Sequence, residues 1–136
     1  MATIYKEILV RASPEFVWDA IKDFGAVHTR LARGFVKDTV RSGDVRTVTF
    51  ANGFVAREQL VSVSDEQRRL VYALVGGPTS HHNAYFQVFA APSGQSRVLW
   101  VTDLLPEDAR ALISQMVDLG SAAIQQTLAE GRNSSL

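Results

Sequence analysis

Residues 34–105 consist almost entirely of short segments rich in β-branched and aromatic residues, and this run constrains the fold more than any other part of the chain. Turn-forming residues separate the segments, and Asn52-Gly53 is the strongest hairpin signal among them. Because the links are short, segments that follow one another are expected to pair antiparallel. We predict strands over residues 34–41, 44–50, 54–64, 68–75, 80–90 and 96–105.

The N-terminal part adds one strand and two short helices. Residues 3–11 alternate apolar and polar side chains, which predicts a strand. Ser13-Pro14 then predicts a helix start, because serine caps a helix N-terminus well and proline is favoured at the first helical position. Gly25 ends this helix, and residues 26–32 are expected to form a second short one.

A long helix is expected at the C-terminal end. Pro106, followed by Glu107 and Asp108, is typical of a helix N-terminus, and the pattern continues to about Glu130. The apolar positions of this helix form one continuous face: Leu112, Ile113, Met116, Leu119, Ala123, Ile124 and Leu128.

Together these elements predict an α+β architecture. A sheet of seven antiparallel strands twists and curls, and the long helix is the natural cover for its apolar face. The space between a curled sheet and one helix is often incompletely filled, so a cavity is expected there. We expect a single domain over residues 1–130 and a frayed tail over residues 131–136.

Charge and cysteine content exclude several classes of function. The chain has 14 basic and 14 acidic residues, so nothing favours nucleic acid as a partner. It has no cysteine, which excludes disulfides, thiolate catalysis and cysteine-based metal sites. No apolar run approaches the length that spans a membrane. We expect a cytoplasmic protein that needs no cofactor and is not an integral membrane protein; the oligomeric state stays open.

Four segments of the chain resemble the START-like, or SRPBCC, superfamily. They are residues 12–25 (ASPEFVWDAIKDFG), 57–77 (REQLVSVSDEQRRLVYALVGG), 83–88 (NAYFQV) and 98–108 (VLWVTDLLPED). The resemblance covers roughly residues 3–130. It implies the helix-grip fold of the birch pollen allergen, the bacterial polyketide cyclase/dehydrase-like proteins and the plant abscisic acid receptors. Because that superfamily contains both carriers and cyclases, the fold alone does not choose a function.

The resemblance to the abscisic acid receptors implies a polar anchor inside the cavity. Their cavity glutamate is matched here by Glu58 and their cavity lysine by Arg33. Their gate loop corresponds to residues 51–54 and their latch to residues 80–82, although the gate and latch sequences differ. What carries over is a ligand cavity with two rims.

Glu58 is the candidate for a catalytic as well as a ligand-binding role. Alternation puts it on one strand face with Phe54 and Leu60, and the resemblance implies that this face looks inward. A carboxylate in an apolar cavity needs a partner, and Arg33 is the matched candidate. The other possibility is a solvent-facing Glu58 paired with a neighbouring arginine.

Further wall residues are expected from the strands and the last helix. The hydroxyls of Tyr72 and Tyr85 could orient a ligand oxygen or belong to ordinary core residues. Trp100 and Asp103 point to opposite faces of one strand, so only one of them faces the cavity. The expected walls are Phe54, Leu60, Tyr72, Leu74, Tyr85, Gln87, Leu112, Met116 and Gly120.

The adjacent residues His81 and His82 suggest a metal site, an acid–base group at the cavity rim, or two exposed histidines. Neighbours in a strand point to opposite faces, and no metal-binding spacing occurs, so we expect no metal. His81 is retained as a rim residue, while the exposed alternative stays open.

Three functions fit these expectations. The first is binding of a small hydrophobic molecule, such as a lipid, a polyketide or an aromatic metabolite, with Arg33 and Glu58 as its polar anchor. The second is a polyketide cyclase/dehydrase-type enzyme in which Glu58 moves protons during an aldol-type ring closure or a dehydration. The third is a regulatory interaction module with a filled core.

Overall fold

The computed structural model describes residues 2–134 of the chain. Its strands form one antiparallel sheet in the order β1-β7-β6-β5-β4-β3-β2, so β1 and β2 are the two edges. The strands are β1 Ala2–Val10, β2 Val36–Ser42, β3 Val45–Phe50, β4 Val55–Ser64, β5 Arg69–Leu74, β6 His81–Ala90 and β7 Ser96–Leu105.

The helical elements lie before and after the run of strands β2 to β7. Helix α1 (Pro14–Lys22) and the π-helical turn η1 (Val27–Leu31) follow β1, and α2 (Arg110–Ser134) follows β7. Short 3₁₀ turns, η2 (Pro92–Gly94) and η3 (Glu107–Ala109), flank β7. None of the helices within residues 2–134 is long and apolar enough to cross a membrane.

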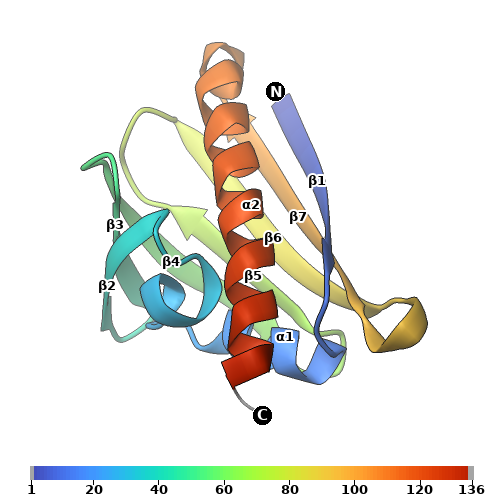
Figure 1. Cartoon of the computed structure of the whole chain (residues 1–136). Helices are drawn as coiled ribbons and strands as arrows, with labels where there is room; N and C mark the ends of the chain where they lie inside the picture. Colours follow the sequence, from blue (N-terminus) through green and yellow to red (C-terminus); the bar gives the residue numbers. More distant parts are fainter. Residues whose placement is uncertain (1, 135–136) are drawn as a thin grey trace.

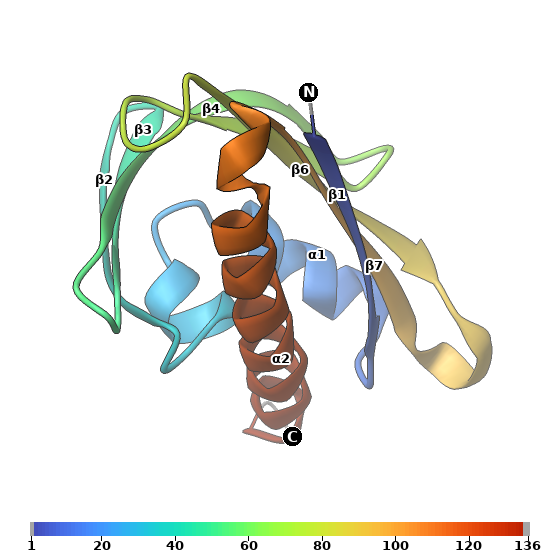
Figure 2. The ribbon, with the colours of Figure 1, turned by 90° about the horizontal axis from the view of Figure 1, so that it is seen from above.

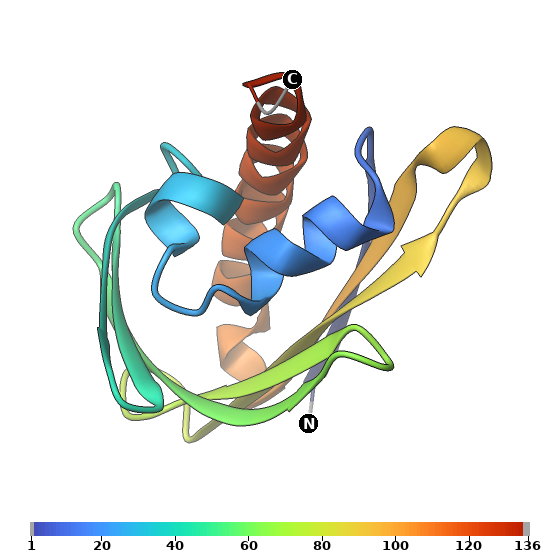
Figure 3. The ribbon, with the colours of Figure 1, turned by 90° about the horizontal axis from the view of Figure 1, so that it is seen from below.

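The sheet curls around α2, as the helix-grip fold predicts. Figure 1 shows α2 lying in front of the sheet, and Figure 2, seen from above, shows the strands from β2 to β1 bending around it. From below, α1 and the segment that contains η1 close one end of the curled sheet beside the C-terminal half of α2 (Figure 3). The predicted seven-stranded α+β fold is therefore confirmed.

Helix α2 is longer than the sequence pattern indicated. The pattern ends near Glu130, whereas the helix continues to Ser134. The expected frayed tail is therefore helical over residues 131–134, and its last part, residues 135–136, lies outside the described residues.

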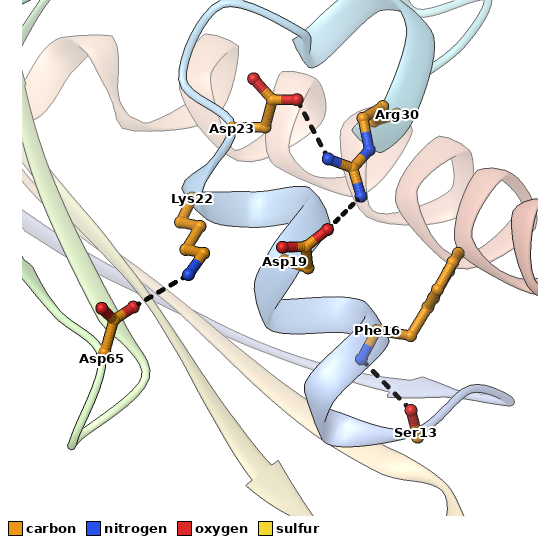
Figure 4. A network of polar contacts seen from close by, with 7 residues as sticks. All are labelled: Ser13, Phe16, Asp19, Lys22, Asp23, Arg30 and Asp65. Atoms are coloured by element: carbon orange, nitrogen blue, oxygen red, sulfur yellow. Dashed lines mark hydrogen bonds and ion pairs between the residues drawn. The ribbon is translucent and has the colours of Figure 1, made fainter.

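Helix α1 begins where the sequence predicts. The Ser13 hydroxyl accepts a hydrogen bond from the Phe16 backbone N–H at 3.2 Å, and Pro14 is the first helical residue (Figure 4). Val17 and Ile21, spaced one helical turn apart, are buried against the sheet side of the molecule.

Ion pairs connect α1 to the elements around it. Arg30 of η1 lies 2.7 Å from Asp19 and 3.0 Å from Asp23, and Lys22 lies 3.3 Å from Asp65 in the turn after β4 (Figure 4). The two carboxylates raise the pKa of Arg30. The two Arg30 pairs connect η1 to α1, and the Lys22 pair connects α1 to the turn after β4. Each exposed pair contributes little stability alone.

The concave face of the sheet is apolar by alternation. On β6 the inward residues are buried, as Ala84 and Phe86 illustrate, while their neighbours Asn83 and Tyr85 face outward. Cross-strand register aligns Ala84 with Thr102 and Phe86 with Trp100 of β7. This face and the inner side of α2 enclose the space in which the candidate site lies.

Candidate functional site

Two adjacent pockets lie between α2 and the concave face of the sheet. The outer pocket is bordered by the N-terminal half of α2 and by the two turns β3–β4 and β5–β6; the inner pocket lies toward η1. The outer pocket is lined by Phe35, Phe50, Phe54, Ala56, Glu58, Tyr72, Leu74, Pro78, His82, Trp100, Thr102, Ile113, Met116 and Val117. The inner pocket is lined by Val27, Leu31, Ala32, Phe35, Val36, Arg46, Val48, Phe50, Glu58, Tyr72, Phe86, Trp100, Gly120 and Ile124.

Aromatic side chains narrow the space between the two pockets. Phe35, Phe50, Glu58, Tyr72 and Trp100 line both pockets, and the rings of Phe35 and Phe50 meet edge to face at 5.2 Å. The water-accessible volume is about 60 Å³ in the outer pocket and about 50 Å³ in the inner pocket. Since one water needs roughly 10–15 Å³ by this measure, each pocket has room for only a few waters.

A buried ion pair lies at the floor of the inner pocket, and its Glu58 member also lines the outer pocket. Arg46 of β3 and Glu58 of β4 are paired in the sheet register, and Arg46 Nε donates to Glu58 Oε1 at 2.7 Å. Their exposed fractions are only 3% and 7%. Arg46 Nη1 also donates to the Phe24 carbonyl at 3.3 Å, and its guanidinium lies 4.1 Å from the centre of the Phe24 ring.

A stack of aromatic rings borders this floor. Phe86 lies between Tyr72 and Trp100, with ring centres 6.1 Å and 4.8 Å away, and Trp100 Nε1 donates to the Tyr72 hydroxyl oxygen at 3.1 Å. Burial, and then the charge of Glu58, raises the pKa of the Tyr72 hydroxyl. Tyr72 therefore stays neutral and serves as a fixed polar point in the wall.

Gly120 lets α2 approach this stack closely. A Cβ atom at Gly120 would lie 3.0 Å from Phe35 Cε2 and 3.1 Å from Trp100 Cη2, closer than side chains normally pack. Glycine inside a helix costs roughly 1 kcal/mol relative to alanine. Here the glycine allows α2 to pack closely against the rings of Phe35 and Trp100.

The local turn at Asn52-Gly53 places Phe54 at the pocket mouth. Gly53 has φ +90°, which favours glycine, and the Asn52 side chain accepts a hydrogen bond from the Phe54 N–H at 2.9 Å. Pro78, in the β5–β6 turn, lines the same pocket. The resemblance implied cavity rims at residues 51–54 and 80–82; the first range coincides with the β3–β4 turn, whereas His81 and His82 already belong to β6 and Pro78 lies just before them.

His82 points into the outer pocket, and His81 does not. His82 is 9% exposed, whereas His81 is exposed on the outer face of β6. Burial, and then the charge of His81, lowers the pKa of His82 to about 4, so its imidazole is neutral at pH 7. The alternative of two exposed histidines is therefore wrong for His82, and His81 is not a rim residue because strand alternation turns it outward.

Several residues predicted as cavity walls do lie around the pockets. Phe54, Glu58, Tyr72, Leu74 and Met116 line the outer pocket, and Gly120 lines the inner one. Of the pair left open by the sequence, Trp100 faces inward. Asp103 faces outward and accepts a hydrogen bond from the Thr3 hydroxyl at 2.6 Å.

Arg33 does not reach Glu58. Its side chain is 49% exposed and its guanidinium lies 3.9 Å from Glu130 of α2. Arg33 follows η1 outside the sheet, whereas Arg46 sits directly opposite Glu58 in the β3–β4 ladder. The predicted Arg33–Glu58 anchor is therefore wrong, and Arg46 is the partner.

Other predicted wall residues also lie away from the pockets. Tyr85 and Gln87 are on the outer face of β6, where Arg69 lies 4.5 Å above the Tyr85 ring. Leu112 is 52% exposed because the inward side of α2 runs through Ile113 and Val117 instead. Leu60 packs against the main core without lining either pocket.

Sequence reasoning missed Arg46, Phe35 and Phe50, and it placed His81 rather than His82 at the pocket. For Arg46 and Phe50 a signal was present, because alternation places both on one face of β3 with the buried Val48. Within the described residues, no group of three or more histidine, aspartate or glutamate side chains could hold a metal ion.

Known proteins resemble this chain in sequence and in overall structure. Residues 1–129 match the family model described as polyketide cyclase/dehydrase and lipid transport. The protein XoxI from Bacillus cereus is similar in structure, with TM-score 0.83, 25% identity, and coverage of 94% of this chain and 96% of that chain. A Thermobifida fusca protein solved by NMR gives TM-score 0.78, 28% identity, and coverage of 98% and 95%.

A plant enzyme shares the fold at lower identity. Norcoclaurine synthase from Thalictrum flavum, solved as a point mutant with a transition-state analogue, gives TM-score 0.71, 19% identity, and coverage of 96% of this chain and 95% of that chain. This likeness shows the fold alone. Among curated proteins, none matches this sequence.

Proposed function

The chain belongs to the polyketide cyclase/dehydrase and lipid transport family, and we propose that it binds a compact, mainly apolar molecule in the outer pocket. One observation carries the proposal: a mainly apolar pocket, with Phe35, Phe50, Phe54, Tyr72 and Trp100 in its wall, lies against the buried ion pair Arg46–Glu58. Apolar pockets with a few placed polar groups are typical of small-molecule sites, since burial supplies affinity and the polar groups supply orientation.

The size of the pocket narrows the class of ligand. A water-accessible volume of about 60 Å³ corresponds to roughly four to six waters, which is the space of one small ring or a short branched chain. A long lipid or a multi-ring polyketide would need Phe35 and Phe50 to move apart and join the outer and inner pockets. We therefore favour a single-ring or similarly compact ligand.

A cyclase or dehydratase remains the second candidate, because the family description includes such enzymes and Glu58 lines both pockets. Against it, Glu58 already accepts from Arg46. If Glu58 took a proton from a substrate, the Arg46 charge would be left buried without a counter-charge, which is costly. The ion pair thus supports a fixed anchor over a proton-transfer group.

The first test is native mass spectrometry of freshly purified protein, with organic extraction of the same sample. We expect a small apolar molecule to be retained by the wild type and lost from Ala56→Leu, because Ala56 lines the outer pocket and is 5% exposed. Ala73→Leu is the matched control, since Ala73 lies on the outer face of β5 opposite Asn83.

The outcomes separate the three functions. Loss of the molecule in Ala56→Leu alone supports binding in the pocket. Turnover of the extracted molecule that disappears in Glu58→Gln, while binding persists, would support the enzyme. No retained molecule in the wild type, together with no binding of 1,4-dimethylbenzene or 4-methylphenol by calorimetry, would overturn pocket binding and favour the filled-core interaction module.

A further inference from the structure

We propose that Tyr72 and Glu58 select ligands that carry a neutral hydroxyl group, which is held between their side chains in the region shared by the outer and inner pockets. The inference rests on the proposed function, because it assigns the polar recognition of the same ligand. It is carried by the positions of the two residues and by the hydrogen-bonding capacity that each retains toward the pockets.

Tyr72 and Glu58 are neighbours on the concave face of the sheet. Glu58 of β4 pairs with Leu74 of β5, and Tyr72 is two residues before Leu74 on the same face. The backbones of such diagonal neighbours lie roughly 7–8 Å apart, which is within reach of long side chains. Both residues line the outer pocket and also the inner pocket. Their side chains therefore border the same part of the ligand space.

The hydroxyl end of Tyr72 is the part of its side chain that borders the pockets. The ring stacks on Phe86 of β6 with ring centres 6.1 Å apart, and the Arg46 guanidinium lies 5.1 Å from the ring centre. These two residues come from strands on opposite sides of β5, so they cover the two faces of the ring. The surface with which Tyr72 lines the pockets is therefore at the ring edge and the hydroxyl.

The Tyr72 hydroxyl retains an unused donor. Its oxygen accepts from Trp100 Nε1 at 3.1 Å, but its hydrogen has no acceptor among the described residues. A hydroxyl group has one donor hydrogen in addition to its acceptor lone pairs, and buried polar groups nearly always find partners. The Tyr72 hydrogen is thus available to an acceptor that enters the pockets.

The Glu58 carboxylate retains unused acceptor sites. An ionised carboxylate has about four lone-pair sites, and within the described residues only Arg46 donates to Glu58. The Glu58 side chain is 9% exposed, and because it lies on the concave face this surface faces the pockets. The charge of Glu58 contributes to the raised pKa of Tyr72, so the two groups are close, yet no hydrogen bond joins them.

A hydroxyl group fits this arrangement because one oxygen can both accept and donate. It can accept from the Tyr72 hydroxyl and donate to the Glu58 carboxylate, whereas a carbonyl, ether or fluorine has no hydrogen for Glu58. Arg46 already balances the charge of Glu58. An ammonium or carboxylate group would therefore add an uncompensated charge to a buried site, which favours a neutral ligand group.

The apolar body of such a ligand lies in the outer pocket. Leu74 follows Tyr72 on the same face of β5, toward the β5–β6 turn, and Met116 of α2 lines the same pocket. A single ring that extends from the bound hydroxyl would contact Leu74 and Met116, with its far end toward Pro78. The ligand class is thus a compact apolar molecule with a hydroxyl at its inner end.

The test measures dissociation constants by calorimetry for 4-methylphenol, 4-fluorotoluene and 4-methylbenzoate. Fluorine is close to a hydroxyl group in size but cannot donate a hydrogen bond, so the ratio of the first two constants isolates the hydroxyl. Tyr72→Phe removes the Tyr72 hydroxyl and keeps the ring. Tyr85→Phe is its matched control, because Tyr85 lies on the outer face of β6.

A double variant removes the carboxylate. Arg46→Met/Glu58→Leu leaves no buried arginine charge, and replacing both members of a buried ion pair by apolar residues often preserves stability. Arg97→Met/Glu7→Leu is the matched control, because it removes an exposed ion pair whose members lie 3.5 Å apart.

We expect the preference for 4-methylphenol over 4-fluorotoluene to fall about five- to tenfold in Tyr72→Phe, which corresponds to one net hydrogen bond of about 1 kcal/mol. It should fall roughly tenfold or more in Arg46→Met/Glu58→Leu, because hydrogen bonds to charged groups are stronger. Both controls should keep the preference of the wild type. A mere loss of packing around Trp100 would weaken both probes alike and leave their ratio unchanged.

An unchanged ratio in a folded Tyr72→Phe or a folded Arg46→Met/Glu58→Leu protein would overturn the inference. So would tighter binding of 4-methylbenzoate than of 4-methylphenol by the wild type. If neither variant folds, the carboxyl ¹³C signal of Glu58 in the wild type must shift on addition of 4-methylphenol and not of 4-fluorotoluene; any other result overturns the inference.

Failure of the proposed function gives a different result. If the wild type binds neither 4-methylphenol nor 4-fluorotoluene, the proposed function itself fails. If it binds both, and their ratio is the same in every variant, only the selection by Tyr72 and Glu58 fails.

Discussion

Arg46 Nε lies 2.7 Å from Glu58 Oε1, across the β3–β4 ladder, with both side chains almost completely buried. The guanidinium is held further by the Phe24 carbonyl and the Phe24 ring. A pair fixed in this way contributes a rigid, net-neutral floor to the inner pocket. Its members are therefore coupled, and each depends on the other for compensation of its buried charge.

Breaking this pair on one side should be costly. We expect Arg46→Met to lower the free energy of unfolding by about 3–5 kcal/mol, because Glu58 is left buried without a counter-charge. The double variant Arg46→Met/Glu58→Gln should recover part of that loss. Urea denaturation of the single and double variants measures the coupling; purely additive losses would show that the two charges do not compensate each other.

Gly120 should not tolerate a β-branched side chain. Gly120→Ala gains about 1 kcal/mol of helix propensity but presses its Cβ atom against Phe35 and Trp100. We expect Gly120→Val to lower the free energy of unfolding by roughly 1–3 kcal/mol through overpacking and to change the near-ultraviolet circular dichroism of Trp100. A stable Gly120→Val protein with an unchanged spectrum would contradict the close approach of α2 to the aromatic stack.

The Tyr72 hydroxyl should stabilise the position of Trp100. Tyr72→Phe removes the acceptor of the Trp100 Nε1–H, so we expect a loss of about 1 kcal/mol in the free energy of unfolding and a shift of the Trp100 indole N–H signal in NMR. Tyr85→Phe is the control, because Tyr85 lies on the outer face of β6. Equal effects of the two substitutions would argue against a specific Tyr72–Trp100 bond.

The free energy of unfolding should decrease as the pH is lowered, because His82 is protonated more readily in the unfolded chain. Its pKa is about 4 in the folded chain and 6.5 when unperturbed, so between these values the unfolded chain binds more protons. The loss of stability from protonation of His82 is absent above pH 6.5. It reaches on the order of 3 kcal/mol in the free energy of unfolding as the pH falls to 4. Urea denaturation at several pH values should show a shallower fall for His82→Leu than for the wild type.

The control for this pH dependence is again the neighbouring histidine. His81→Leu should leave most of the fall in place, because His81 is exposed. Parallel pH profiles for the wild type and His82→Leu would mean that His82 titrates normally and is not buried as described.

The fold could be predicted because its determinants are local. The alternation of residues along each strand, the turn at Asn52-Gly53 and the Ser13-Pro14 helix start all depend on neighbours in sequence. These signals agree with one another, so they predicted the order of elements and the curled sheet.

The site was harder to predict because both faces of β6 carry aromatic residues. Tyr85 and Phe89 resemble interior residues, yet they lie outside, where Arg69 and Arg97 cover their rings at 4.5 Å and 4.9 Å. Arginine side chains can shield aromatic surface from water, so an aromatic ring alone does not identify the inner face.

The partner of Glu58 was missed because it depends on strand register. Arg46 faces Glu58 only through the pairing of β3 with β4, which the turn between them sets. Arg33 matched by resemblance but follows η1 outside the sheet. The sequence predicted that β3 and β4 pair, but not the register that sets Arg46 opposite Glu58.

The methyl group of Met116 lines the outer pocket, so its NMR signal reports whether a compact apolar molecule binds there. The chain has two methionines, so methyl-labelled protein gives two signals, and Met116→Leu assigns the relevant one. We predict that 1,4-dimethylbenzene shifts the Met116 methyl signal saturably and gives intermolecular nuclear Overhauser effects to it. Saturable binding that leaves this signal unmoved and gives no such effect would show that the molecule binds elsewhere.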